Sequence, residues 1–298
     1  MARNTSEFTT VSPQDIPIPQ MHQYLLGAIA PRPIAFASTI DPEGNINLSP
    51  FSFFNVFSSN PPTLIFSPAR GRDKLIKHTL DNVQKVPQVV INTVNYPMVQ
   101  QMSLTSTAYP KQINEFEKAG FTEIKSTLVK PPRVKESPVA FECKINQIIP
   151  LGENAGAGNL VIAEVLLIHL QNQYLVDGQL DLTKLDLVGR MGANWYCHTN
   201  SLCMFEVQKP GKKQGIGVDQ LPQHIRNSSI LTGNDLGKLG SLATLPSTKE
   251  LNKVRNTAEF EAILLLPEDQ RMTVLHQTAQ HYIMQEQTAD ALAMLLAF

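Results

Sequence analysis

Short stretches of alternating hydrophobic and polar residues run through the first two thirds of the chain, a pattern typical of β-strands. Ile34–Ile40 and Gln88–Asn92 are short and apolar. From Val139 to Asn146 the residues alternate, which predicts a strand with Val139, Phe141, Cys143 and Ile145 buried and the even-numbered residues wet. Leu160–Leu170 is apolar on both faces and should be a central strand. Repeated antiparallel strands with few helices between them predict a barrel rather than a βαβ sheet.

A second strand, Asn45–Phe57, has an unusual pattern. It follows the turn Asp41–Gly44, where a proline fixes φ and a glycine tolerates a positive φ. Its polar side chains recur at every third residue among aromatic ones: Ser49, Ser52, Asn55 and Ser58. Because a strand has a side-chain period of two, a bend near Pro50 would be needed to turn them toward a common point. The alternative is a half-buried strand whose serines satisfy backbone groups.

Residues 67–82 read as the end of a strand, a basic loop and a helix. Pro68 and Gly71 break the strand, Asp73 is a candidate N-cap, and apolar residues then recur at helical spacing. A helix N-terminus offers free amides and a partial positive charge, which suit a phosphate. The loop and helix add four cations, Arg70, Arg72, Lys74 and Lys77. The alternative is a solvated basic helix face.

The two ends of the chain have a different character. Residues 1–20 are polar and proline-rich and should be an extended lead-in, with Met21–Leu26 as a short helical turn. Residues 201–298 should form a C-terminal extension that is rich in loops and then helical. In its last segment Leu275, Tyr282, Ala289 and Leu296 recur every seven residues, which predicts a helix with a narrow apolar stripe. This helix would pack on the barrel or across a dimer, or bind another protein.

Composition narrows the functional classes. The 298 residues are 42% hydrophobic, which is enough for a sizeable core, and carry a net charge of −1 with no basic cluster for nucleic acid. The first ten residues lack the pattern of a signal peptide, and Glu164 interrupts the longest apolar run, which is too short for a membrane span. Three scattered cysteines fit a reducing compartment. We therefore expect a cytoplasmic protein that binds neither membrane nor nucleic acid.

Other motifs carry little chemistry. Gly156-Ala157-Gly158 half-matches a dinucleotide fingerprint, but a strand follows it instead of a helix. Cys197-His198 with Cys203 lacks the spacing of a metal site, so no metal is predicted. His169, inside an apolar strand, should be a core or interface histidine. Arg190 is either a structural ion-pair partner or a cofactor contact.

The segments RPIAFAST, DPEGNINLSPFSFFN and NPP, together spanning residues 32–62, resemble the flavin reductase-like family of split-barrel FMN-binding proteins. That family includes flavoredoxin and the reductase components of two-component monooxygenases. The resemblance covers roughly residues 24–196. Lys77–Asn82 resembles the family signature Lys-Asp-Thr-x-x-Asn, with His78 in place of the aspartate. Tyr109–Glu117 resembles a family segment that often ends Asp-Glu-Phe, and we transfer no role to it.

The resemblance implies a mainly β protein with helices: an FMN-binding split β-barrel over residues 21–200, forming a homodimer with the flavin at the interface. Lys77, Thr79 and Arg72 would hold the phosphate. Ser49, Ser52 and Asn55 would meet the ring and ribityl groups, and Pro50 and Ser67 complete the expected set of cofactor-binding residues. No catalytic residue is predicted, because the flavin carries the chemistry.

The resemblance also implies a reaction. Hydride would pass from NADH or NADPH to FMN, and electrons would then pass to oxygen, free flavin or a partner such as a monooxygenase. Two alternatives stay open: an electron carrier reduced by a partner protein, and a non-enzymatic ligand-binding barrel whose C-terminal helices recruit partners. Neither the nicotinamide preference nor the role of the C-terminal extension is evident from the residues.

Overall fold

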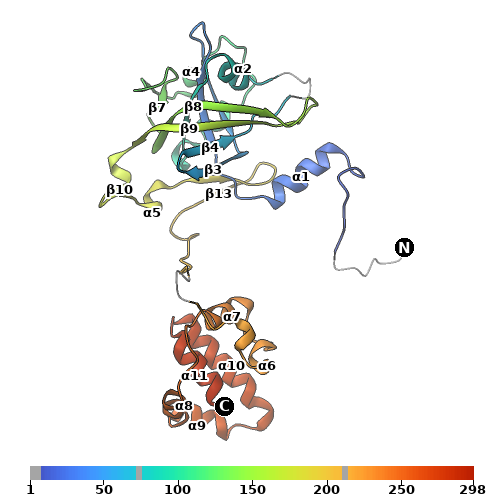
Figure 1. The fold of residues 1–298 in the computed structure, drawn as a ribbon, viewed down its shortest axis with the longest axis vertical. Helices are drawn as coiled ribbons and strands as arrows, with labels where there is room; N and C mark the ends of the chain where they lie inside the picture. Colours follow the sequence, from blue (N-terminus) through green and yellow to red (C-terminus); the bar gives the residue numbers. More distant parts are fainter. Residues whose placement is uncertain (1–7, 72–75, 210–213) are drawn as a thin grey trace. The chain divides into compact units, whose positions relative to one another are not determined.

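The computed structural model describes residues 8–71, 76–209 and 214–298. The chain divides into two compact units, Met1–Phe205 and Glu206–Phe298. We call them the barrel unit and the helical unit (Figure 1). The division falls at Phe205, close to the boundary expected at residue 200.

The barrel unit consists of strands with a few short helices between them. Its longer strands are β1 (Ala35–Ile40), β2 (Ile46–Phe51), β3 (Phe54–Ser59), β4 (Pro62–Phe66), β5 (Gln88–Asn92), β8 (Val139–Pro150) and β9 (Asn159–Leu170). Its short strands are β6 (Glu123–Ile124), β7 (Arg133–Val134), β10 (Leu175–Val176), β11 (Gln179–Leu180), β12 (Val188–Arg190) and β13 (Tyr196–His198). Its helices are α1 (Ile18–Ala28), α2 (His78–Lys85), α3 (Val99–Leu104), α4 (Glu115–Ala119) and α5 (Leu182–Leu185).

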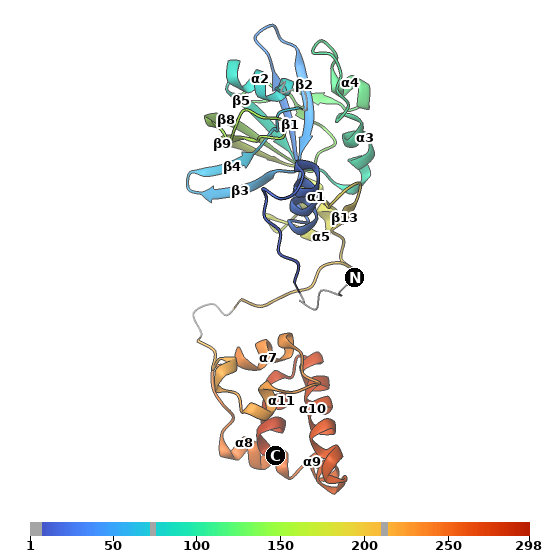
Figure 2. The same ribbon diagram turned by 90° about the vertical axis from the view of Figure 1, so that its right-hand side faces the viewer.

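The seven longer strands that the structure describes form one antiparallel sheet in the order β2-β1-β5-β8-β9-β4-β3. The two edge strands, β2 and β3, are separated in the chain by Ser52 and Phe53 alone. Three Cα–Cα steps of about 3.8 Å therefore keep the ends of these strands within about 11 Å, so the sheet must curl until its edges approach (Figure 2). The predicted barrel is confirmed. The predicted strand Asn45–Phe57 is two strands, and its bend lies at Ser52–Phe53 instead of near Pro50.

Hydrophobic side chains pack on both faces of β1. Ala35 and Ala37 belong to a cluster that draws on most of the sheet strands and on α2, so this cluster fills the inside of the barrel. Phe36, which points to the opposite face, packs with residues of α3 and α4 in a second cluster. The helices α2 and α4 are thus fixed against the barrel by two different cores, with the start of β2 between them.

The alternation predicted for β8 holds only in part. Cys143 is buried as expected, but so are Ala140 and Glu142, which were expected to be wet. The Glu142 carboxylate accepts hydrogen bonds from the backbone amides of Thr127 and Leu128, at 2.7 and 2.6 Å, and lies 2.6 Å from His169 Nε2. A register shift after Glu142 accompanies this burial. The alternation of β8 therefore fails at Glu142 because the loop that contains Thr127 and Leu128 supplies the hydrogen-bond donors that a buried carboxylate needs.

α1 belongs to the barrel unit but buries none of its residues. It begins at Ile18 and is longer than the helical turn expected at Met21–Leu26. In Figure 1 it lies beside the sheet, and Ile18, Leu25 and Ile29 are exposed. These apolar side chains are therefore left facing solvent instead of packing in a core.

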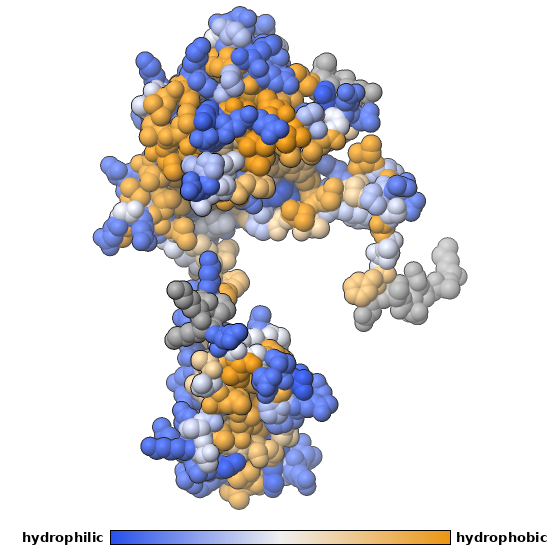
Figure 3. All heavy atoms as spheres, viewed as in Figure 1, coloured by the Kyte–Doolittle hydropathy of each residue, from blue (hydrophilic) through white to orange (hydrophobic). Residues whose placement is uncertain are grey.

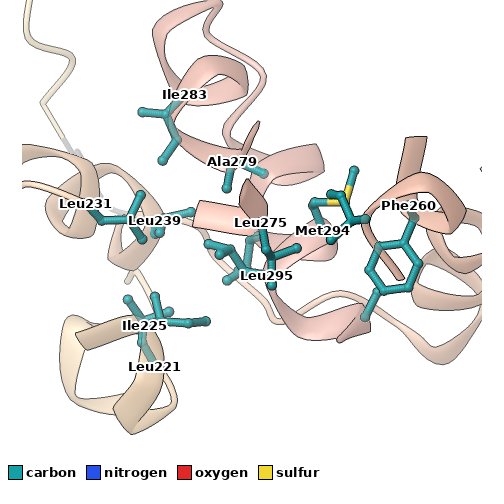
Figure 4. Close-up of a cluster of buried hydrophobic side chains, with 14 residues drawn as sticks. Leu221, Ile225, Leu231, Leu239, Phe260, Leu275, Ala279, Ile283, Met294 and Leu295 are labelled. Carbon is teal, nitrogen blue, oxygen red and sulfur yellow. The ribbon is translucent and has the colours of Figure 1, made fainter. Parts of the chain in front are cut away.

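The helical unit has its own core. Its helices are α6 (Gln223–Arg226), α7 (Gly233–Gly240), α8 (Thr248–Arg255), α9 (Ala258–Leu265), α10 (Glu268–Met284) and α11 (Thr288–Ala297). Leu239, Leu275 and Leu295, from three different helices, are fully buried and meet at the centre (Figure 4). The prediction of one long helix with an apolar stripe near the C-terminus is wrong. α10 ends at Met284 and α11 begins at Thr288, so the seven-residue repeat crosses the turn between two helices.

Candidate functional site

A cavity of about 190 Å³ lies in the barrel unit, bounded by β2, the start of α2, residues 105–109 and the start of α4. We call it the α2 cavity. Its lining includes Ser49, Lys77 and Thr79, three of the residues predicted from the sequence to bind the cofactor. These residues come from β2 and α2, which the two barrel cores bring together. The lining also includes Tyr109 and Glu115, for which the sequence suggested no role.

The first turn of α2 is open toward this cavity. Lys77 is in extended conformation at the N-cap position and makes no side-chain cap. Its carbonyl oxygen accepts from the amides of Leu80 and Asp81, at 2.9 and 3.1 Å, which leaves the amides of His78 and Thr79 without an acceptor among the described residues. Such free amides, together with the helix dipole and an exposed lysine, attract an anion.

A hydrogen-bonded chain joins the three elements around the cavity. The Thr79 hydroxyl donates to Asn47 Oδ1 at 2.6 Å, and Asn47 Nδ2 donates to Glu115 Oε1 at 3.0 Å. The other oxygen of Glu115 accepts from the backbone amide of Leu48 at 3.0 Å. Thr79 is only 1% exposed and Glu115 only 3%. The Thr79 hydroxyl is thus already committed as a donor, and its backbone amide is the group that remains available to a ligand.

Glu115 is a buried acidic residue at this site. Burial raises the pKa of Glu115 above its ordinary value, against the hydrogen bonds from Leu48 and Asn47 and the proximity of His78, which lower it. The other carboxylates near α2 are neutralised: Lys111 lies between Asp41 and Asp81, at 3.2 and 3.3 Å. Glu115 is therefore the acidic group that faces the cavity without a lysine or arginine partner among the described residues.

The remaining predicted residues lie elsewhere in the barrel unit. Ser52 Oγ lies 3.4 Å from Nε of the buried Arg32, and Pro50 pairs with Phe36 in the sheet. Asn55 is exposed on the edge strand β3, where its side chain accepts from the next amide in the chain.

Ser67 is buried and accepts from the amide of Asn159 at 3.0 Å. Arg72 lies outside the described residues, as does the expected N-cap, Asp73. The structure therefore gathers Ser49, Lys77 and Thr79, and does not bring Ser52, Asn55 or Ser67 to the same cavity.

The sequence contained weak signals for the residues that it missed. Glu115 follows Asn114, which caps α4 by accepting from the amide of Phe116 at 3.0 Å, and an Asn before a short helix is a recognisable N-cap. Gly120 ends this helix in the left-handed conformation, with φ of 70°. Nothing local indicated that Glu115 turns inward, because its partners Asn47 and Leu48 lie far away in the sequence.

A second feature is an open apolar groove of about 1040 Å³ between α1 and the loop that joins β12 to β13. Tyr24 of α1 and Trp195 of the loop line it, and the Trp195 side chain is 76% exposed. Further apolar side chains are exposed on β3 and on the second half of β9: Val56, Phe57, Leu166, Ile168 and Leu170. Hydrophobic side chains also gather on the face of the barrel drawn in Figure 3. Exposed apolar patches of this kind commonly mark surfaces that contact a ligand or another protein.

The other candidate residues take structural positions. The Arg190 guanidinium lies 4.6 Å from the centre of the Tyr196 ring and donates to the carbonyl oxygen of Trp195. Of the two roles considered for Arg190, the ion pair is not found within the described part of the chain. His198 stacks on Tyr96 and contacts Asp186. No three His, Cys, Asp or Glu side chains among the described residues are placed to hold a metal ion. None of the described helices is long and apolar enough to cross a membrane.

Comparison with known proteins adds independent findings. A family model described as "Flavin reductase like domain" matches residues 27–182, more than half of the chain. An uncharacterised protein of Aquifex aeolicus is 35% identical over 188 residues, which cover 63% of this chain and 94% of the relative. This relative has too few other residues for a counterpart of the helical unit.

Two solved structures have a similar fold. Nitrilotriacetate monooxygenase component B from Bacillus cereus aligns with a TM-score of 0.64 and 27% identity, over 68% of this chain and 100% of that one. The 2-nitrobenzoate 2-nitroreductase NbaA of Pseudomonas fluorescens aligns with a TM-score of 0.60 and 26% identity, over 67% of this chain and 96% of that one.

Proposed function

Because this chain belongs to the flavin reductase-like family, we propose that it is an FMN-dependent oxidoreductase that passes hydride from NADH or NADPH to the flavin. The observation that carries the choice of FMN is the open first turn of α2. There, two backbone amides without acceptors among the described residues and the exposed Lys77 face a cavity. FMN carries a terminal phosphate dianion, which such a site suits.

The residues of the α2 cavity fit the phosphate end of FMN. The amides of His78 and Thr79 would donate to phosphate oxygens, and Lys77 would add a charge-assisted hydrogen bond of about 1.5–3 kcal/mol. Ser49, on β2, would donate to the ribityl chain or the phosphate. Thr79 would act through its amide, since its hydroxyl is held by Asn47. Arg72 remains a proposed phosphate contact from the resemblance alone.

The flavin ring would lie beyond the α2 cavity, where Ser52, Asn55 and Ser67 are the residues that the resemblance assigns to it. A bound flavin supplies the hydride-accepting ring, so this chain needs to bind and orient two ring systems rather than provide a nucleophile. We therefore assign no acid, base or nucleophile to the reaction.

We further propose that the protein is a homodimer. The support is the exposed apolar surface of the barrel unit, above all α1, which buries none of its own residues, and the groove next to it that contains Trp195. A second copy would cover these groups and remove them from water at about 25 cal/mol per Å² of apolar area. A monooxygenase component that takes up reduced flavin is a proposed partner, as the name of the Bacillus cereus protein suggests.

The first test is the visible absorbance spectrum of the purified protein, followed by titration with FMN. We expect a flavin spectrum or FMN binding, and a tenfold or greater loss of FMN affinity in Lys77→Ala. Lys118→Ala is the matched control, because Lys118 is an exposed lysine outside the α2 cavity. Absence of flavin binding would overturn the proposal.

Kinetics separate the reductase from an electron carrier. With FMN bound, the reductase should oxidise NADH or NADPH in the steady state without another protein. A protein that binds FMN but oxidises neither nucleotide would instead be a carrier reduced by a partner. Sedimentation of the unmodified protein and of Trp195→Ser would test the dimer, which the substitution should weaken.

A further inference from the structure

Glu115 holds an unusual position for an acid, because it lines the cavity that we assign to a phosphate dianion. Both of its carboxylate oxygens accept hydrogen bonds, from Asn47 Nδ2 and from the amide of Leu48, each at 3.0 Å. Through Asn47 it is linked to Thr79, the residue whose amide opens toward the same cavity. Glu115 therefore fixes the position of the anion site and also places a negative charge beside it.

Among the groups that face Glu115, His78 offsets part of this charge by its proximity, but none forms an ion pair with it in the described part of the chain. From β2 the facing groups are the uncharged Asn47 and Leu48, and from the start of α2 they are Lys77, which is exposed, and His78. From the segment after α3 the cavity receives Tyr109, and α4 itself carries Glu117 and Lys118, both exposed. Neither Lys77 nor any other lysine or arginine that the structure describes forms an ion pair with Glu115.

Two negative charges in one small cavity repel each other, and a carboxylate can relieve the repulsion by binding a proton. Glu115 is already biased toward protonation, because its burial disfavours the charged form and raises its pKa. A phosphate dianion would favour protonation further. The neutral acid keeps a carbonyl oxygen for Asn47 or Leu48 and gains an O–H that can donate.

We propose that Glu115 is a positioning residue that takes up a proton from solvent when a phosphate dianion enters the α2 cavity. One proton leaves the buffer and one carboxylate becomes a carboxylic acid, so the charge of the loaded site rises by one unit. The inference rests on the proposed binding of FMN in this cavity. It predicts that FMN affinity increases as pH falls, by up to tenfold for each pH unit over the range in which one proton is taken up.

The test is a proton count by titration calorimetry. FMN is added to the full-length protein at pH 7.0, in two buffers of different ionisation enthalpy, where a second phosphate pKa of about 6 leaves the free phosphate mostly a dianion at the start. We expect proton uptake by the unmodified protein and by Glu117→Gln, a matched change on the exposed side of the same helix. Glu115→Gln should lose the uptake and flatten the pH profile of FMN affinity, which a purely structural role for Glu115 would not do. Glu115→Asp, which keeps an ionisable group, should restore uptake.

Three outcomes would overturn the inference: no uptake by the unmodified protein, uptake that persists in Glu115→Gln, or uptake that disappears in His78→Gln instead. If Glu115→Gln fails to fold, the proton counts of the unmodified protein and of His78→Gln still test the inference. Riboflavin, which lacks the phosphate, should bind without proton uptake. If neither flavin binds, the proposed function fails; if FMN binds without uptake, only the role of Glu115 fails.

Discussion

Two helices of the helical unit, α7 and α8, differ from α2 of the barrel unit in how their first backbone amides are satisfied. α7 and α8 are closed by capping boxes, in which Thr232 and Asp235, or Ser247 and Glu250, satisfy each other's backbone amides. In the barrel unit, α2 begins at Lys77 with no side-chain cap, and its first amides open toward a cavity. A helix that completes its own N-terminus gains stability, whereas one left open keeps its amides for a ligand.

The two units also differ in what they bury. Among the described residues of the helical unit, Asp235 and His276 are the buried polar or charged side chains, and the rest of its core is aliphatic or aromatic. The barrel unit buries many more, including Asn47, Thr79 and Glu115 around the α2 cavity. Buried polar networks are costly unless satisfied, so their concentration near a cavity points to function, while a plain apolar core points to stability.

The largest expected effect tests whether each core supports only its own unit. Phe36→Ala should lower the free energy of unfolding of the barrel unit by about 3–5 kcal/mol, and Leu275→Ala that of the helical unit by about 2–5 kcal/mol, because both side chains are fully buried. Differential scanning calorimetry should show two transitions, each moved by one variant. A single transition moved equally by both variants would contradict the separation.

A smaller effect is expected from closing the open helix. Lys77→Ser places at the N-cap of α2 a residue whose hydroxyl can accept from the amide of Thr79, the second residue of the helix. We expect the barrel unit to gain about 1 kcal/mol of stability. FMN affinity should fall about ten- to a hundredfold, since the cation and one amide are lost to the ligand. Denaturant unfolding and FMN titration measure the two changes; unchanged affinity would show that α2 is not the anion site.

The reciprocal change opens a closed helix. Ser247→Ala removes the side-chain oxygen that accepts from the Glu250 amide, and should lower the stability of the helical unit by about 1 kcal/mol without changing FMN affinity. Urea unfolding followed by circular dichroism measures the first effect, and FMN titration measures the second. A loss of FMN affinity would show that the helical unit contributes to the site.

The smallest effect concerns pH. Burial, and secondarily the proximity of His224, lower the pKa of His276, whose Nδ1 lies 2.8 Å from the Ser228 hydroxyl. Because the unfolded chain binds this proton more readily, the contribution to stability is present above the ordinary histidine pKa of about 6.5 and is lost as pH falls below it.

Thermal unfolding between pH 5 and 8 checks this prediction. His276→Leu should weaken the pH dependence of the helical transition, and His281→Gln, a change at an exposed histidine, should not. Equal pH dependence in all three proteins would assign the effect to other groups.

Much of the fold follows from local sequence. β5 has the residues predicted for it, and the turn before β2 places Gly44 at a positive φ of 95° as its glycine suggested. These features depend on side-chain period and backbone preference, which are properties of neighbouring residues. The motifs around residues 32–62 and 77–82 likewise indicated the family, which the match over residues 27–182 shows.

The candidate site was only partly predictable. Lys77, Thr79 and Ser49 were expected and do line one cavity, but the hydroxyl of Thr79 is turned to Asn47. The inward position of Glu115 had no local signature. Ser52 and Asn55 do not line the cavity that Ser49 lines, because the chain leaves one edge of the sheet at Ser52 and joins the other.

The sequence by itself therefore determined β1, β5, the turn before β2, the family and the lysine at the start of α2. The tertiary structure alone decided that β2 and β3 lie on opposite edges of one sheet, that Glu142 is buried, and that Asn47 joins Thr79 to Glu115. The physical reason is the distance along the sequence over which each effect acts. Period and propensity act over a few residues, whereas closure of a barrel and satisfaction of a buried carboxylate depend on partners supplied by distant parts of the chain.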